Sequence, residues 1–297
     1  MVLIKEQTMD FIIEIIKTIL LGIVEGITEW LPISSTGHMI LLNDLLHLNV
    51  SDAFWEMFEV VIQLGAILAV VVLYFTKLWP FVGAKKLAKE NTLLSLGAIG
   101  VKKDTMILWA KVIVAMLPAA LFGILLDDFM DEHFYNSFVV AIALIFYGIL
   151  FIIVEKINKN KDFKVETVDG VDFKTALGIG LFQTLSLVPG TSRSGSTILG
   201  ASMLSVSRGA AAEFSFFLAS PVMLGASFLK VLKFFLDGGE ILAAEAVYLF
   251  VGCAVAFVVS VAAIKFLTDF VKKHSFSAFG VYRIILGIIV LAVYILK

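Results

Sequence analysis

Two short segments of this chain place charged and hydroxyl-bearing residues inside long apolar runs. The first is Glu25-Gly26-Ile27-Thr28-Glu29-Trp30-Leu31-Pro32-Ile33-Ser34-Ser35-Thr36-Gly37-His38, and the second is Pro189-Gly190-Thr191-Ser192-Arg193-Ser194-Gly195-Ser196-Thr197. A charged side chain at bilayer depth costs about 2.5–3.5 kcal/mol on insertion scales, so such groups usually face a partner, a cavity or a substrate. Two acids, an imidazole, a guanidinium and many hydroxyls suit phosphate chemistry at a membrane.

The acids of the first motif, Glu25 and Glu29, are four residues apart and share one face of a helix. Two carboxylates on one apolar face repel each other unless a cation or a shared proton lies between them. A divalent cation fits this spacing, because Mg²⁺ uses one or two carboxylates together with phosphate oxygens. The alternative is a structural pair bonded to nearby hydroxyl or arginine groups. We favour the metal site, with Mg²⁺ or Ca²⁺ as the ion.

Hydroxyl groups and a histidine follow Pro32, which we expect to end this helix. His38 comes directly after Ser34, Ser35 and Thr36, so it could act as a general base or acid toward one of these hydroxyls. The alternative for His38 is a hydrogen-bonded scaffold residue.

The second motif sets Gly190 and several hydroxyls before an apolar helix that we expect to start near Thr197. The free N–H groups at a helix N-terminus form an anion site, and the planar fork of Arg193 matches phosphate oxygens. The alternative for Arg193 is a counter-ion to Glu25 or Glu29. We expect the catalytic residues to be Glu25, Glu29, Ser35, His38 and Arg193, and the substrate-binding positions to be Ser34, Thr36, Gly190, Ser192, Ser194 and Thr197.

The composition is that of an integral membrane protein. Of the 297 residues, 60% are hydrophobic and only 16% are charged, and the mean hydropathy is +1.00. Such a chain has too little polar surface for a soluble fold. The net charge of −2 gives no basic field, which argues against a nucleic-acid partner.

The hydropathy pattern predicts an all-α polytopic membrane protein, because a span needs about 20 apolar residues. We place spans at 57–79, 108–126, 137–157, 212–236, 242–268 and 278–297. The motif regions, 11–48 and 173–206, are pairs of shorter apolar stretches with Pro/Gly/Ser-rich centres. Irregular backbone at membrane depth is tolerated only where it is buried in protein or lines a cavity, so we predict two re-entrant helical hairpins.

The loop charges alternate along the chain. Lysines gather in the loops at 77–103 and 156–174 and at 272–273, including Lys85, Lys86 and Lys89, whereas the segments at 127–132 and 237–240 hold acids and no lysine. Under the positive-inside rule the lysine-rich loops are cytoplasmic. Both termini then lie outside, and the two hairpins enter the membrane from opposite sides.

An internal repeat explains this arrangement. An offset of about 158 residues aligns the two motifs, pairing Gly22, Glu25, Ser34, Thr36 and Gly37 with Gly180, Gln183, Ser192, Ser194 and Gly195. Each predicted half, 1–160 and 161–297, holds one hairpin and three spans, so the two halves must be inverted. Inverted repeats with broken helices build a site near the midplane where they meet. Glu59 and Glu213 each open an apolar span, and capping explains them as well as function does.

The two motifs resemble those of the bacterial undecaprenyl-diphosphatase family, the bacitracin-resistance type of undecaprenyl-pyrophosphate phosphatase. The resemblance extends to Phe58-Glu59-Val60-Val61-Ile62-Gln63-Leu64-Gly65, to Ser207-Arg208, to Glu213-Phe214-Ser215-Phe216 and to Tyr282-Arg283. It implies a multi-pass enzyme of the bacterial plasma membrane that hydrolyses undecaprenyl diphosphate to undecaprenyl phosphate and inorganic phosphate, with a divalent cation. This recycles the lipid carrier for cell-wall synthesis, and overproduction confers bacitracin resistance.

The sequence leaves several points open. The nucleophile is Ser35 assisted by His38, or alternatively His38 or a metal-activated water. A transporter or flippase for a polyprenyl phosphate lipid is the alternative function, because secondary transporters share inverted repeats with charges at the midplane. We expect the lipid substrate and the bilayer as partners, and both a monomer and a homodimer are compatible with the sequence.

Overall fold

Six long apolar helical segments form the body of the computed structural model, which describes residues 2–83, 91–96 and 99–296. Each is long and apolar enough to cross a membrane, at Asp52–Leu73, Lys103–Leu126, Ser137–Asn158, Arg208–Leu236, Ala243–Lys273 and Ser277–Leu296. The six predicted spans are therefore confirmed. Helices make up 79% of the structure, which confirms the all-α class.

The helix boundaries differ from the prediction at two acidic positions. The first span consists of α3 (Asp52–Val61) and α4 (Gln63–Leu73), and it starts early because the Ser51 side chain accepts a hydrogen bond from the Phe54 N–H, 3.1 Å away. Glu59 therefore lies inside the helix and does not open it. The acidic segment at 127–132 belongs to α6 (Lys103–Phe134) and is not a loop. The predicted cytoplasmic lysines Lys85, Lys86 and Lys89 lie outside the described residues.

Each motif interrupts a pair of helices. The first lies between α1 (Val2–Thr28) and α2 (Ser35–Leu46). The second follows α8 (Phe173–Gln183) and the 3₁₀ turn η3 (Thr184–Leu187) and precedes α9 (Arg193–Met203). The second helix thus begins at Arg193, before the predicted start near Thr197, and the first helix ends at Thr28, before Pro32.

The same serine cap begins both α2 and α9. Ser34 has φ 73° and Ser192 has φ 71°, and their side chains accept hydrogen bonds from the N–H groups of Gly37 (3.3 Å) and Gly195 (3.1 Å). A positive φ is uncommon for a residue with a Cβ atom, and such strain persists only where the surrounding structure fixes it. Both motifs therefore turn the chain in the same way.

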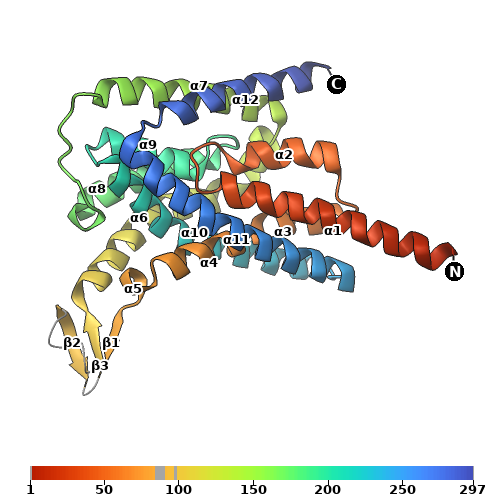
Figure 1. The fold of residues 1–297 in the computed structure, drawn as a ribbon, viewed down its shortest axis with the longest axis horizontal. Helices are drawn as coiled ribbons and strands as arrows, with labels where there is room; N and C mark the ends of the chain where they lie inside the picture. The colour runs from red at the N-terminus through yellow and green to blue at the C-terminus, as the bar shows by residue number, and fades with distance from the viewer. Residues whose placement is uncertain (1, 84–90, 97–98, 297) are drawn as a thin grey trace.

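Helix packing brings the two motifs together. In Figure 1, α7 (Ser137–Asn158) lies beside α12 (Ser277–Leu296), and α1 runs along α11 (Ala243–Lys273), while α6 packs against α8. The central helix α10 (Arg208–Leu236) contacts α3, α4, α6 and α9, and its Phe214, Phe216 and Phe217 are fully buried. These aromatic side chains form a rigid core beside the motif loops.

A small antiparallel sheet was not predicted. Strands β1 (Phe81–Gly83), β2 (Thr92–Leu96) and β3 (Ile99–Lys102) pair in the order β1-β3-β2 and project from one end of the bundle, after the short helix α5 (Phe75–Leu78) (Figure 1). The strands are three to five residues long, too short for an alternating hydropathy pattern to reveal them. Another short element, the 3₁₀ turn η2 (Val168–Gly170), precedes α8.

Candidate active site

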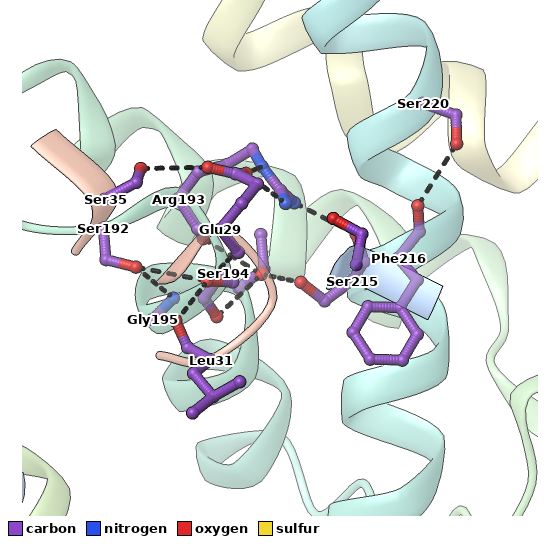
Figure 2. A network of polar contacts seen from close by, with 12 residues as sticks. Glu29, Leu31, Ser35, Ser192, Arg193, Ser194, Gly195, Ser215, Phe216 and Ser220 are labelled. Carbon is purple, nitrogen blue, oxygen red and sulfur yellow. Dashed lines mark hydrogen bonds and ion pairs between the residues drawn. The ribbon is translucent and has the colours of Figure 1, made fainter. Parts of the chain in front are cut away.

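One ion pair joins the two motifs (Figure 2). Arg193 at the start of α9 donates to Glu29 Oε1 from Nη2 at 2.9 Å and from Nε at 3.3 Å. The Arg193 side chain is 11% exposed and the Glu29 side chain 7% exposed. Arg193 is thus the counter-ion of Glu29 in this structure, as the alternative interpretation of the sequence proposed. Burial of both partners makes removal of either one costly, about 3–5 kcal/mol for typical buried pairs.

The second oxygen of Glu29 holds the hydroxyl of the first motif. Ser35 Oγ donates to Glu29 Oε2 at 3.0 Å. One carboxylate therefore connects the Ser35 hydroxyl with the Arg193 guanidinium, as Figure 2 shows. The potential nucleophile, Ser35, and the anion-binding cation, Arg193, are thus each within hydrogen-bonding distance of the potential base, Glu29.

Hydroxyl groups of α9 dock the two loops. Ser194 Oγ donates to the carbonyl groups of Glu29 (3.0 Å) and Leu31 (3.3 Å), which lie beyond the end of α1 and lack helical partners. Thr197 Oγ1 lies 2.7 Å from Ser215 Oγ and also donates to backbone carbonyl groups of its own helix. Both hydroxyls are buried and bonded to the protein, so in this structure they support the loops from inside.

Central helix α10 also fixes Arg193. Arg193 Nη1 donates to the carbonyl oxygen of Ser215 at 3.0 Å. The sequence did not single out Ser215, although its segment belongs to the family resemblance. Because Arg193 uses separate nitrogen atoms for Glu29 and Ser215, its position is fixed by both the first motif and α10.

His38 has hydrogen-bond partners other than Ser35. Its Nδ1 is 2.7 Å from the Ser34 carbonyl oxygen, and its Nε2 is 2.7 Å from the Tyr282 hydroxyl on α12. Because a carbonyl oxygen only accepts, Nδ1 carries the proton, and the neutral ring then accepts from Tyr282 at Nε2. The His38 and Tyr282 rings are also stacked, with an interplanar angle of 8°. The expected contact of His38 with Ser35 is replaced by these two partners, and Ser35 bonds Glu29.

A cavity of about 220 Å³ opens beside the motif loops. Polar side chains of α1, α2, α3, α4 and η3 and of the residue that follows α6 line it, namely Glu25, Ser35, Thr36, Glu59, Gln63, Ser186 and Tyr135. Glu25 is 1% exposed, and its Oε1 has no hydrogen-bond partner among the described residues. Glu59 accepts a hydrogen bond from the Tyr135 hydroxyl at 2.9 Å. The cavity thus brings two carboxylates to the side of the site that holds the Ser35 hydroxyl.

The oxygen donors at this cavity fit a hard divalent cation. A buried carboxylate oxygen without a partner, such as Glu25 Oε1, needs a proton or a cation. Glu29 already uses both of its oxygens for Arg193 and Ser35, so Glu59 is the carboxylate that shares the cavity with Glu25. No group of three or more His, Cys, Asp or Glu side chains in the described part of the chain forms a metal cage. Mg²⁺ commonly binds without one, through one or two carboxylates and substrate phosphate oxygens.

Comparison with known proteins finds similarity over nearly the whole chain. The model of the bacitracin resistance protein BacA family matches residues 18–289. The chain is 56% identical over 287 residues to an undecaprenyl-diphosphatase of Enterococcus faecalis, covering 97% of this chain and 99% of that protein. It is 57% identical to an undecaprenyl-diphosphatase of Acetivibrio thermocellus over 94% of this chain and 97% of that protein. A third, from Lactococcus lactis subsp. lactis, is 54% identical over 95% and 96% of the two chains. With both motifs in contact and this similarity over nearly all of its length, the chain belongs to the bacitracin resistance protein BacA family.

Proposed function

We propose that this protein hydrolyses undecaprenyl diphosphate to undecaprenyl phosphate and inorganic phosphate. The observation that supports this most directly is the contact of Ser35 and Arg193 with the same carboxylate, Glu29. Phosphoryl transfer needs a positioned nucleophile and charge neutralisation more than covalent chemistry by the protein. The relatives named undecaprenyl-diphosphatase support the choice of lipid.

The role of Arg193 is to bind the diphosphate. Its guanidinium forms a planar fork that matches two phosphate oxygens, and substrate oxygens replace Glu29 Oε1 when the lipid binds. The N-termini of α2 and α9, capped by Ser34 and Ser192, supply further N–H groups near the anion. This exchange releases Glu29 from its ion pair and makes it a stronger base.

Ser35 is the nucleophile in this mechanism. Its Oγ proton passes to Glu29 Oε2, its present hydrogen-bond acceptor. The oxygen then bonds to the terminal phosphorus while the bond from this phosphorus to the bridging oxygen breaks, and undecaprenyl phosphate leaves with that oxygen. Glu29 then gives this proton to the departing undecaprenyl phosphate and is a free carboxylate again. Water next attacks the phosphorus of the phosphoserine and gives a proton to Glu29 while the bond from phosphorus to Ser35 Oγ breaks. Glu29 returns that proton to Ser35 Oγ, so inorganic phosphate leaves and Ser35 is regenerated. His38, anchored by Tyr282, orients the start of α2 that carries Ser35.

Glu25 and Glu59 are the residues that would hold a divalent cation, Mg²⁺ or Ca²⁺, with Gln63 beside them. Glu29, the second acid of the first motif, would be a further ligand once Arg193 transfers to the substrate. When bound, the cation neutralises charge on the diphosphate oxygens. The chain's own contribution is to keep the Glu25 carboxylate buried and ready for a positive partner.

The site belongs to a multi-pass protein of the bacterial plasma membrane, and we propose that it opens to the outer face. Both termini lie at the end of the bundle opposite the sheet (Figure 1). The sheet comes directly after the first span in the chain, within the lysine-rich segment that the positive-inside rule assigns to the cytoplasm. Hydrolysis there returns undecaprenyl phosphate to cell-wall synthesis and competes with bacitracin for its lipid target. A homodimer is compatible with this arrangement.

We further propose that residues 1–160 and 161–297 are inverted repeats, each with a re-entrant hairpin. The matching serine caps at Ser34 and Ser192 support this, because both have a positive φ and both bond the glycine three residues later. The packing of α1 with α11 and of α8 with α6 supports it in the same way, since each motif helix meets the second span of the other half.

The experiment is phosphate release from undecaprenyl diphosphate by purified protein in detergent, with and without EDTA, alongside Glu25→Gln. We expect release in wild type that EDTA removes and Mg²⁺ or Ca²⁺ restores, and a loss of about hundredfold in the variant. Phosphate release that survives both EDTA and Glu25→Gln would show that hydrolysis needs neither a divalent cation nor the Glu25 carboxylate. A folded wild-type protein that releases no phosphate would make the transporter or flippase the leading function, because transport alone frees none.

A further inference from the structure

A buried arginine on the last helix contacts both motif loops. Arg283 of α12 is 0% exposed. Its Nη1 donates to the Pro32 carbonyl oxygen at 3.2 Å, and its Nη2 donates to those of Gly190 (2.9 Å) and Thr191 (2.8 Å). Pro32 lies in the first motif, and Gly190 and Thr191 lie in the second. One side chain thus spans the junction between them.

These carbonyl groups need such a donor because the helices are broken. Residues past a helix end leave their carbonyl oxygens without i+4 partners, and at membrane depth no bulk water replaces them. In the described part of the chain Arg283 meets no carboxylate, and its guanidinium lies 5.9 Å from the centre of the Tyr147 ring. Its charge is therefore stabilised by main-chain dipoles and an aromatic face rather than by an acid.

The second motif leaves room for this guanidinium at Gly195. A Cβ atom at Gly195 would lie 3.0 Å from Arg283 Nη1 and 3.1 Å from the Cβ of Ser192. Because three hydrogen bonds hold the guanidinium, it cannot move aside without losing a loop contact. The absence of a side chain at Gly195 therefore allows the Arg283 guanidinium to lie beside the Ser192 cap.

We propose that Arg283 is a positioning residue that sets the distance between Ser35 and Arg193 by joining the two loops. The preceding residue, Tyr282, holds His38 at the start of α2, so α12 fixes the first motif at a second point. The inference rests on the proposed phosphatase function for its kinetic consequence. Its structural consequence, a fixed distance between α2 and α9, stands independently.

The kinetic test compares Arg283→Lys with Arg208→Lys. Lysine keeps the charge but lacks the planar fork, so it cannot serve both loops. Because a misplacement of about 1 Å can cost about a hundredfold in rate, we expect kcat for phosphate release to fall about hundredfold with KM within about threefold. Arg208, about two turns from Ser215 on α10, forms a bidentate pair with Glu155 and has no hydrogen bond to either motif in the described residues. Arg208→Lys should therefore lower the Tm and leave kcat within about twofold.

Two further variants separate positioning from folding. Arg283→Gln has no charge to bury and replaces Arg283→Lys if that variant does not fold. Gly195→Ala displaces the Arg283 guanidinium without changing its chemistry, and we expect kcat to fall in this variant as well. Combined with Arg283→Lys it should add little, because both changes break the same contacts.

The structural test measures the distance between α2 and α9 by electron paramagnetic resonance. Spin labels at Leu45→Cys and Met203→Cys, both exposed, are placed in a Cys253→Ala background that removes the single native cysteine. We expect one narrow distance distribution in wild type and in Arg208→Lys, and a broadened one in Arg283→Lys. Unchanged kcat and an unchanged distribution in Arg283→Lys would overturn the inference. Absence of phosphate release in wild type would overturn the proposed function instead, and the distance measurement would still decide the role of Arg283.

Discussion

The Ser35 hydroxyl has one partner in the site, and that partner is a carboxylate. A serine is a weak nucleophile until a base accepts its proton, and Glu29 Oε2 is 3.0 Å from Ser35 Oγ. Ser35→Ala removes the attacking atom without adding bulk, so we expect phosphate release to fall by about 10²–10⁴-fold. Ser220→Ala is the matched control, because among the described residues Ser220 bonds only the carbonyl group of Phe216 within α10, and it should retain wild-type turnover. Near-normal release by Ser35→Ala would assign the attack to water or to His38.

The cavity acids make a separate prediction about metal binding. Glu25 and Glu59 line the same cavity, so Glu25→Gln and Glu59→Gln should each weaken Mn²⁺ binding, measured by titration with EPR detection, by about 10–100-fold. Glu213→Gln is the control, because Glu213 pairs with Lys77 and does not line the cavity, so it should not affect the ion. A Glu59→Gln variant with wild-type Mn²⁺ affinity would leave Glu25 and Glu29 as the only protein acids for the metal.

At the scale of elements, the site depends on how closely α8 can approach α6. Gly180 on α8 faces the Ala115 carbonyl group so tightly that a Cβ atom would overlap it. Overpacking of this kind typically costs about 1–3 kcal/mol, so Gly180→Ala should lower the Tm in detergent and shift α8 away from α6. Gly225→Ala on α10 meets nothing within 4 Å and is the control. It should leave the Tm unchanged or raise it slightly, because alanine is the better helix former. Equal Tm values for the two variants would show that α8 and α6 adjust freely.

The elements also show where prediction from sequence succeeds. Hydropathy located the six spans because each has more than enough apolar residues to cross a bilayer. The breaks at 29–34 and 188–192 followed from their proline, glycine and serine content. The predicted start near Thr197 was wrong because the side chain of Ser192 already caps the helix, and periodicity carries no signal for a cap in a positive-φ conformation.

Long-range pairings could not be predicted from spacing. His38 was expected beside Ser35, its near neighbour, yet it bonds Tyr282, 244 positions away in the sequence. Similarly, Glu29 lies past the last residue of α1 and bonds Arg193, which spacing offered only as an alternative to a metal ion shared with Glu25, and the shared ion stays a prediction. Only the packing of α12 and α9 against the first motif decides these contacts.

At the scale of the whole molecule, the proposed orientation predicts which surfaces are reachable from outside the cell. In a Cys253→Ala background, Glu240→Cys should react with a membrane-impermeant maleimide in intact cells, because it lies on the lysine-poor side. Lys161→Cys, in the lysine-rich segment between α7 and α8, should react only after lysis. The opposite labelling pattern would show that the molecule has the opposite orientation in the membrane, with the site open to the cytoplasm.

The position of Arg283 in the final helix has a consequence for biosynthesis. The chain leaves the ribosome from its N-terminus, so both motifs are made and inserted before α12 exists. Until α12 arrives, the Pro32, Gly190 and Thr191 carbonyl groups lack their donor, and the two loops lack their common anchor. We therefore expect the two loops to take their final arrangement, and the site to reach full activity, only after α12 enters the membrane.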